Sequence, residues 1–128
     1  MNVLNFYHIG KIIPENAEYI GRENKKYNLK KSKFANPYYV KGDKGSTLKD
    51  YRIWLWNEVL ELRITKQDIL SLKDKDLICY CDPTPCHGNI VKALVLYVIN
   101  NEEEFDRKIE EYQKLKKQKN HSNKHFTG

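Results

Sequence analysis

Short apolar runs separated by turn residues predict three β-strands. Residues 3–9 and 17–20 are rich in β-branched and aromatic side chains, a composition typical of strands. A third strand is predicted over residues 76–81. Its alternate positions form two apolar sets, which are Leu77, Cys79 and Cys81 on one face and Ile78 and Tyr80 on the other. A strand that is apolar on both faces is typical of a covered, mostly parallel sheet.

Apolar residues at helical spacing predict the helices between and after these strands. Thr47 and Thr65 each precede an aspartate by three positions, a capping pattern that begins one helix ending near residue 62 and a shorter one ending near residue 72. Residues 90–99 are apolar nearly all round, which indicates a buried helix. From residue 102 an amphipathic helix follows, and its apolar stripe consists of Phe105, Ile109, Tyr112 and Leu115.

This order of elements predicts one three-layer α/β domain with a short, mostly parallel sheet and an added C-terminal helix. A chain of 128 residues is long enough to bury a single core. We expect the domain to cover residues 1–118 and a polar, flexible tail to cover residues 119–128. The sequence shows no signal peptide and no apolar run of about 20 residues that could span a membrane, so we expect a cytoplasmic protein.

Positive charge is concentrated between residues 21 and 45. The formal net charge of the chain is +6, and the lysines of this segment that could contact nucleic acid are Lys25, Lys26, Lys30, Lys31 and Lys33. Because aromatic residues are interleaved with them, the segment is suited to hold phosphates while rings stack on bases. The same pattern is equally typical of a lysine-rich, solvated loop.

All three cysteines lie within residues 79–88, beside a histidine. This window follows the predicted third strand, at the edge of the sheet where α/β proteins commonly hold ligands. Clustered cysteine and histidine in a reducing cytosol indicate metal binding or reactivity rather than a structural disulfide. The window is therefore the candidate functional site.

The start of the next helix decides the chemistry of this window. With Thr84 as the cap, Cys86 and His87 fall in the first turn, where the positive end of the helix dipole favours a thiolate. Asp82 is the alternative cap. With Thr84 as the cap, the backbone N–H groups of the first turn could also bind an anion, and Gly88 would allow its close approach.

Four interpretations of the window remain open at the level of sequence. The first is a zinc site formed by Cys79, Cys81, Cys86 and His87, although the C-x-C spacing departs from the usual C-x-x-C. The second is a nucleotide or phosphate pocket in which Cys86 or His87 contacts the ligand. The third is core packing of the cysteines, and the fourth is a redox switch such as a Cys81–Cys86 disulfide.

Four ordered motifs resemble one known family. Residues 76–91 combine a strand ending in Cys-aromatic-Cys with a proline turn, a Cys-His pair and a helix. Upstream lie a strand ending in Gly21-Arg22, an Asn36-Pro37 segment, and a Tyr-x-x-Trp-Leu helix at residues 51–55. Over residues 17–97 these motifs resemble the family of domain of unknown function 4326 (DUF4326), small proteins of phages and bacteria.

The resemblance implies a Rossmann-like α/β domain in a phage or bacterial cytosol, with kinship to nucleotide-handling folds. The site residues that it nominates are Arg22, Asn36, Cys79, Cys81, Cys86 and His87.

We therefore expect a protein that binds, and could process, a nucleotide-like phosphorylated ligand at the strand-to-helix site. Cys86 and His87 would supply nucleophilic or acid/base chemistry for hydrolysis or transfer. The expected ligand-binding residues are Arg22, Asn36, Cys79, Cys81, Thr84 and Gly88. The alternative is a zinc-stabilised, non-catalytic module that binds nucleic acid or a host protein through the lysine-rich surface.

Overall fold

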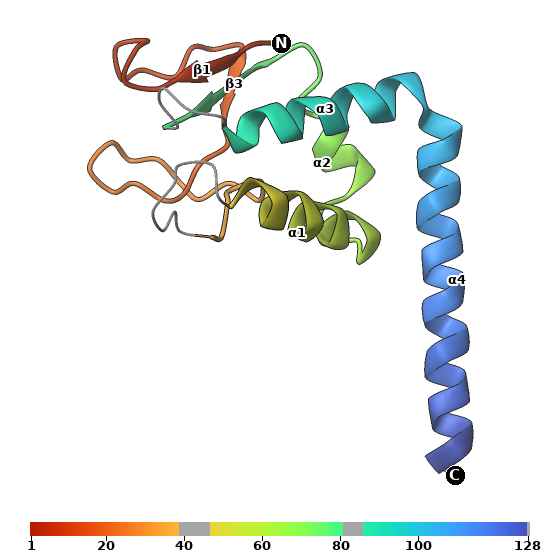
Figure 1. Cartoon of the computed structure of the whole chain (residues 1–128). Helices are drawn as coiled ribbons and strands as arrows, with labels where there is room; N and C mark the ends of the chain where they lie inside the picture. Colours follow the sequence, from red (N-terminus) through yellow and green to blue (C-terminus); the bar gives the residue numbers. More distant parts are fainter. Residues whose placement is uncertain (39–46, 81–85, 128) are drawn as a thin grey trace.

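A parallel sheet of three short strands forms one side of the fold (Figure 1). The computed structural model describes residues 1–38, 47–80 and 86–127. The strands are β1 (Val3–Asn5), β2 (Ala17–Tyr19) and β3 (Asp76–Cys79), in the spatial order β1-β3-β2. Both outer strands run parallel to β3. The two N-terminal strands therefore flank a strand that follows them by more than fifty residues.

The central strand has the two apolar faces that the sequence predicted. Leu77, Ile78 and Cys79 are all buried. Backbone hydrogen bonds continue the pairing past the strand ends, from Phe6 N to Cys79 O at 2.8 Å and from Ile20 N to Ile78 O at 2.9 Å. The mostly parallel sheet is confirmed.

The first strand is shorter than predicted because the chain turns directly after Asn5. The side chain of Asn5 accepts a hydrogen bond from Tyr7 N at 2.8 Å, and its carbonyl accepts from His8 N at 3.0 Å. These are local turn bonds, typical of asparagine, and they compete with continuation of the ladder. Residues 7–9 therefore leave the sheet.

Four helices accompany the sheet in the described part of the chain. They are α1 (Leu48–Leu60), α2 (Lys66–Leu70), α3 (His87–Asn100) and α4 (Glu102–Thr127). Thr65 and Asp68 form the predicted capping box at α2. Thr47 precedes α1 as predicted, but its side chain makes no capping hydrogen bond. Its hydroxyl instead accepts from Asn36 Nδ2 at 3.1 Å.

The two faces of the sheet are covered differently. Leu77 and Cys79 belong to the main core, together with buried residues of all four helices. On the opposite face, Ile78 packs with Phe6 and Ala17, and the partly buried residues around them come from strands and loops rather than helices. The mixed α/β class is confirmed, whereas a Rossmann-like three-layer arrangement is not confirmed.

The last helix is anchored at its start and projects away from the rest of the fold (Figure 1). Phe105 is fully buried in the main core. Lys66 of α2 forms ion pairs with Glu102 at 2.6 Å and Asp106 at 3.0 Å. The helix continues to Thr127, through most of the segment that we expected to be a polar tail. None of the described helices has the length and apolar character needed to cross a membrane.

Candidate functional site

The carboxyl ends of the three parallel strands meet at one edge of the sheet, as parallel pairing requires. Cys79 is the last residue of β3, and α3 begins at His87. Cys81 and Thr84, which were predicted as site residues, lie outside the described residues.

Cys86 is the N-cap of α3, so the helix begins later than predicted. Its backbone is extended, with φ −111° and ψ 144°, and its Sγ accepts a hydrogen bond from Gly88 N at 3.2 Å. Thr84 and Asp82 as caps are therefore wrong. Sulfur therefore occupies the place of the usual capping oxygen, and Cys86 Sγ lies at the positive end of the helix dipole.

Two sulfur atoms meet at this helix start. The Sγ atoms of Cys79 and Cys86 are 2.7 Å apart. Both residues are buried, with 1% and 4% of their surfaces exposed. The structure thus joins two of the three predicted cysteines in one contact between the end of β3 and the cap of α3.

His87 completes a buried cluster with these sulfurs, which we call the Cys–His cluster (Cys79, Cys86 and His87). Its Nε2 lies 2.9 Å from the carbonyl oxygen of Ile20, just beyond the end of β2. A carbonyl only accepts, so Nε2 carries the hydrogen. In neutral His87 the other ring nitrogen, Nδ1, is then an acceptor, and it lies 3.7 Å from Cys86 Sγ. The cluster therefore pairs a thiol with a base of defined tautomer.

Tyr51 of α1 forms the wall of this cluster. Its ring meets the His87 ring edge to face, with centroids 5.1 Å apart. Its hydroxyl donates to Phe34 O at 2.6 Å. Burial raises the pKa of Tyr51, and the electrostatic interaction with Cys86 raises it further. Tyr51 is therefore a neutral donor, and its ring shields one side of the imidazole.

Gly88 allows α3 to approach the sheet closely. A Cβ at this position would lie 2.7 Å from Val3 Cγ1 and 3.2 Å from Ile20 Cδ1. The glycine was predicted to allow the approach of an anion. The structure gives it a packing role, and its role toward a ligand stays a prediction.

Arg22 and Asn36 contact each other. Both residues lie far from the cysteines in the sequence. Arg22 Nε donates to Asn36 O at 2.8 Å, and Arg22 Nη2 donates to Tyr38 O. Asn36 Oδ1 accepts from Tyr38 N at 2.9 Å. This network begins two residues after Ile20, whose carbonyl binds His87. It holds the Asn-Pro turn in place at the start of α1.

Sequence reasoning missed Thr47 and Tyr51 as parts of this region. Thr47 was interpreted only as a helix cap, yet its buried hydroxyl binds Asn36. Tyr51 was named only as the first residue of the Tyr-x-x-Trp-Leu motif. The signal that was available for Tyr51 is its hydroxyl on an otherwise apolar helix, since a buried polar atom needs a partner.

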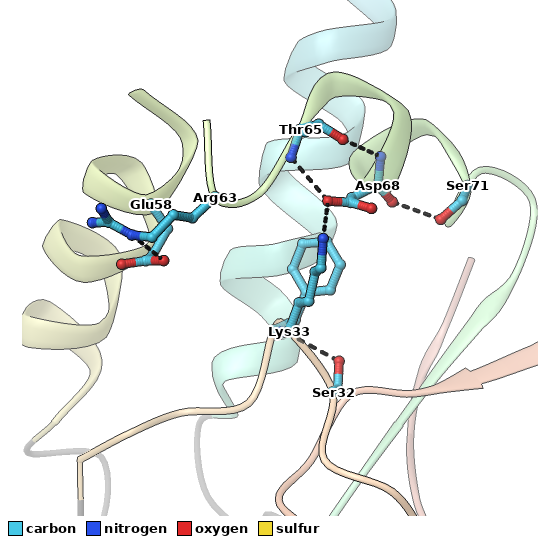
Figure 2. Close-up of polar contacts among 8 residues, drawn as sticks. Ser32, Lys33, Glu58, Arg63, Thr65, Asp68 and Ser71 are labelled. Carbon is cyan, nitrogen blue, oxygen red and sulfur yellow. Dashed lines mark hydrogen bonds and ion pairs between the residues drawn. The ribbon is translucent and has the colours of Figure 1, made fainter. Parts of the chain in front are cut away.

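The described lysines of the basic segment, Lys25, Lys26, Lys30, Lys31 and Lys33, are exposed, and some of their charges contact other groups. Lys33 Nζ lies 3.0 Å from Asp68 Oδ2, which belongs to the capping box of α2 (Figure 2). Lys26 Nζ lies over the Tyr27 ring at 5.4 Å from its centroid. A bridge between Asn24 and Leu29 folds this segment back on itself.

A pocket of about 300 Å³ lies between the basic segment and α1. It is lined by Lys31, Lys33 and Trp54, among others, and by Glu58 and Arg63. The last two form an ion pair of 2.9 Å (Figure 2). The pocket volume is at the lower limit of small-molecule sites.

Metal binding by the predicted four-residue set depends partly on Cys81, which the structure does not describe. Among residues 1–38, 47–80 and 86–127 no group of three or more Cys, His, Asp or Glu is arranged to hold a metal ion. Zinc therefore stays a prediction.

Comparison with known proteins identifies a family. A family model described as Domain of unknown function (DUF4326) matches residues 5–97. The matched range contains the Cys–His cluster and the Arg22–Asn36 network. No curated protein and no solved structure matches the chain.

Proposed function

The chain belongs to the DUF4326 family, and we propose that it binds a nucleotide-like phosphorylated ligand at the carboxyl edge of its sheet, beside Cys86 and His87. The observation that carries the proposal is the position of Cys86 Sγ. This atom caps α3 through Gly88 N at 3.2 Å and lies 3.7 Å from His87 Nδ1. A thiol between a helix start and a base has the two features that activate cysteine nucleophiles.

The surroundings favour an anionic ligand. The carboxyl edge of a parallel sheet is the usual ligand site of α/β folds, and the first turn of a helix attracts phosphates. Arg22 adds a cation at the same edge, held by the carbonyls of Asn36 and Tyr38. A guanidinium held in this way keeps its charge and is suited to orient a phosphate.

Processing of the ligand would be hydrolysis or transfer at a glycosidic or phosphate bond. In this scheme His87 Nδ1 takes the proton of the Cys86 thiol, and the thiolate attacks the reacting carbon or phosphorus while the bond to the leaving group breaks. In hydrolysis, water then releases the second product from the sulfur. Ile20 acts as a positioning residue, because its carbonyl sets the tautomer of His87.

The test compares the wild-type chain with Cys86→Ser by calorimetric titration with ADP, GDP, CDP and UDP. Serine is a better N-cap than cysteine, so this variant keeps the acceptor for Gly88 N–H and the folded state. We expect one or more of the nucleotides to bind the wild type, and Cys86→Ser to lose about tenfold or more in affinity. The matched control is Asn89→Ala, a substitution at the exposed position that follows Gly88 in α3. This variant should bind as the wild type does.

Absence of binding by the wild type contradicts the proposal. Equal affinities of the wild type and Cys86→Ser contradict the role of Cys86, provided that both melt at the same temperature.

A second candidate, a zinc-stabilised module that binds nucleic acid, is favoured by the orientation of His87. Histidines that bind metals usually donate their other ring N–H to a carbonyl or carboxylate, as His87 does to Ile20 O. Native mass spectrometry of protein purified without chelator tests this: one stoichiometric zinc supports the second candidate, and a metal-free mass removes it. Nucleic-acid binding would also weaken steeply with salt and with charge reversal at Lys30 and Lys31.

A further inference from the structure

We propose that Cys79 and Cys86 form a redox pair that a peroxide oxidises reversibly to a disulfide. The proposal goes beyond the proposed function, because it concerns the two sulfurs themselves and needs no ligand. It also differs from the Cys81–Cys86 pair that the sequence indicated.

The geometry of the pair carries the inference. The two Sγ atoms are 2.7 Å apart, whereas a disulfide bond is about 2.0 Å long. The bond therefore requires a shift of less than about 1 Å, shared by two side chains. Cys79 lies at the end of β3 and Cys86 at the cap of α3, so each sulfur is held by a regular element.

The surroundings decide which sulfur reacts first. Cys86 Sγ accepts from Gly88 N at 3.2 Å and faces His87 Nδ1 at 3.7 Å. A sulfur at a helix N-terminus next to a base is the usual setting of cysteines that react with peroxide. With 1% of its surface exposed, Cys79 is the more enclosed of the two, against 4% for Cys86. Cys86 is therefore the peroxidatic residue and Cys79 the resolving residue.

The chemical steps balance with hydrogen peroxide as the oxidant. The Cys86 thiolate attacks one peroxide oxygen, the O–O bond breaks, and the products are Cys86 sulfenic acid and hydroxide. The Cys79 sulfur then attacks the Cys86 sulfur, and the S–O bond breaks to release a second hydroxide. Two protons from the two original thiols convert these hydroxides to two molecules of water. The pair loses two electrons, and a dithiol reductant restores both thiols.

The disulfide removes the nucleophile from the Cys–His cluster. Cys86 in the oxidised state has no thiol proton to give to His87 and no thiolate to attack a ligand. Oxidation therefore switches off the site, a consequence that rests on the proposed function. Because small size favours passage to a sulfur that is 4% exposed, we expect peroxide to react faster than bulky disulfide reagents.

Three single variants separate the possible sulfur pairs, because the chain has three cysteines. Cys81→Ser leaves only Cys79 and Cys86, Cys79→Ser leaves Cys81 and Cys86, and Cys86→Ser leaves Cys79 and Cys81. Each full-length variant is treated with equimolar hydrogen peroxide, quenched with N-ethylmaleimide under denaturing conditions, and weighed by mass spectrometry. A disulfide makes the protein about 2 Da lighter than the reduced form and leaves no thiol to alkylate.

We expect Cys81→Ser to form the disulfide at least about tenfold faster than either other variant, and dithiothreitol to restore both thiols. Cys86→Ser should keep two alkylatable thiols, because it removes the sulfur that caps α3 beside His87.

Three results overturn the inference. They are two alkylatable thiols in peroxide-treated Cys81→Ser, equal rates in Cys79→Ser and Cys81→Ser, and products about 16 or 32 Da heavier in place of the disulfide. Stoichiometric zinc on the purified protein would overturn it as well, since the sulfurs would then be metal ligands. Because no nucleotide is used, failure of ligand binding leaves these outcomes unchanged, and failure of the disulfide leaves the calorimetric test unchanged.

Discussion

The Cys–His cluster and the charged cluster around α2 (Lys33, Asp68 and Thr65) use polar atoms in opposite ways. In the Cys–His cluster, two sulfurs and an imidazole are buried against one another. In the charged cluster, the side chains are partly or largely exposed and join the basic segment to the start of α2 (Figure 2).

The difference determines how strongly the polar groups of each cluster interact. Exposed ion pairs are screened by water and contribute little, so the charged cluster mainly sets the position of a loop. Groups in a buried cluster interact in a medium of low dielectric constant, where each hydrogen bond counts for more. The sequence nominated Lys33 as a nucleic-acid contact and the Cys–His residues as a ligand site, and the proposed function assigns the chemistry to the buried cluster.

The largest effect is expected when the buried imidazole is removed. His87→Ala leaves the carbonyl of Ile20 without this donor and creates a cavity beside Tyr51. Together these effects should lower the free energy of unfolding by about 3 kcal/mol. His87→Gln is the matched control, since its amide can still reach the Ile20 carbonyl, and it should recover part of the loss. Urea denaturation measures both, and equal stability of His87→Ala and the wild type would contradict the cluster.

A somewhat smaller effect is expected from crowding the same helix start. Gly88→Ala places a Cβ 2.7 Å from Val3 Cγ1, and the overpacking should cost about 2 kcal/mol. Asn89→Ala, on the exposed side of α3, should cost much less. If both variants unfold at the same urea concentration, α3 does not approach β1 as closely as described.

Within the charged cluster, the largest loss of stability should come from removing the capping box of α2. Thr65→Ala removes the acceptor for Asp68 N, which lies 3.1 Å from Thr65 Oγ1, and should cost about 1 kcal/mol. Thr65→Ser keeps the hydroxyl and should restore most of this stability in the same denaturation experiment. A Thr65→Ala variant as stable as Thr65→Ser would show that the box contributes nothing.

Acid should weaken the charged cluster through Asp68. The hydrogen bond from Thr65 N and the ion pair with Lys33 lower the pKa of Asp68 below its usual value of about 3.9. A lowered pKa stabilises the folded state above the unfolded-state pKa, and this contribution is lost as the pH falls through the lower folded-state value. Asp68→Asn should therefore lose less stability than the wild type between about pH 5 and pH 2. Parallel pH profiles of the two proteins would contradict this account.

The smallest effect is expected for the surface ion pair itself. Lys33→Ala removes the 3.0 Å contact with Asp68, and the change in unfolding free energy should be below about 0.5 kcal/mol and smaller in high salt. Lys30→Ala, elsewhere in the basic segment, is the control. A loss for Lys33→Ala as large as that for His87→Ala would remove the contrast between the two clusters.

Local signals in the sequence predicted the elements that depend on near neighbours. The capping box of Thr65 and Asp68 spans four residues, and the two apolar faces of residues 76–79 follow from simple alternation. Both patterns depend only on residues that are close together in the sequence, and the structure confirms both. The family was also recognised from short sequence motifs, which occur in a fixed order along the chain.

The cap of α3 depends on contacts that no local pattern contains. Threonine and aspartate are better caps than cysteine by intrinsic preference, which favoured Thr84 and Asp82. The structure places Cys86 at the cap, next to Cys79 Sγ and beside a histidine bound to Ile20, a residue far away in sequence. Tertiary contacts of this kind outweigh a preference of about 1 kcal/mol.

The covering of the second face of the sheet also depends on contacts that no local sequence pattern contains. A three-layer arrangement needs helices on both faces, but residues 6–16 form turns, and aromatic rings cover this face. Phe6 meets the Tyr27 and Tyr80 rings at centroid distances of 5.3 Å and 5.4 Å. Aromatic residues of a predicted strand can equally well pack from a loop, and sequence alone does not distinguish the two.

An amide NMR titration tests most directly whether the Cys–His cluster is the ligand site. ¹⁵N-labelled protein is titrated in turn with ADP, GDP, CDP and UDP, and the signals of Gly88, Ile20 and Arg22 are compared with those of Lys30 and Lys31. The account predicts that a binding nucleotide shifts the first set to saturation and leaves the second set nearly unchanged. Shifts confined to the lysines, or none at all with any of the four nucleotides, would contradict it.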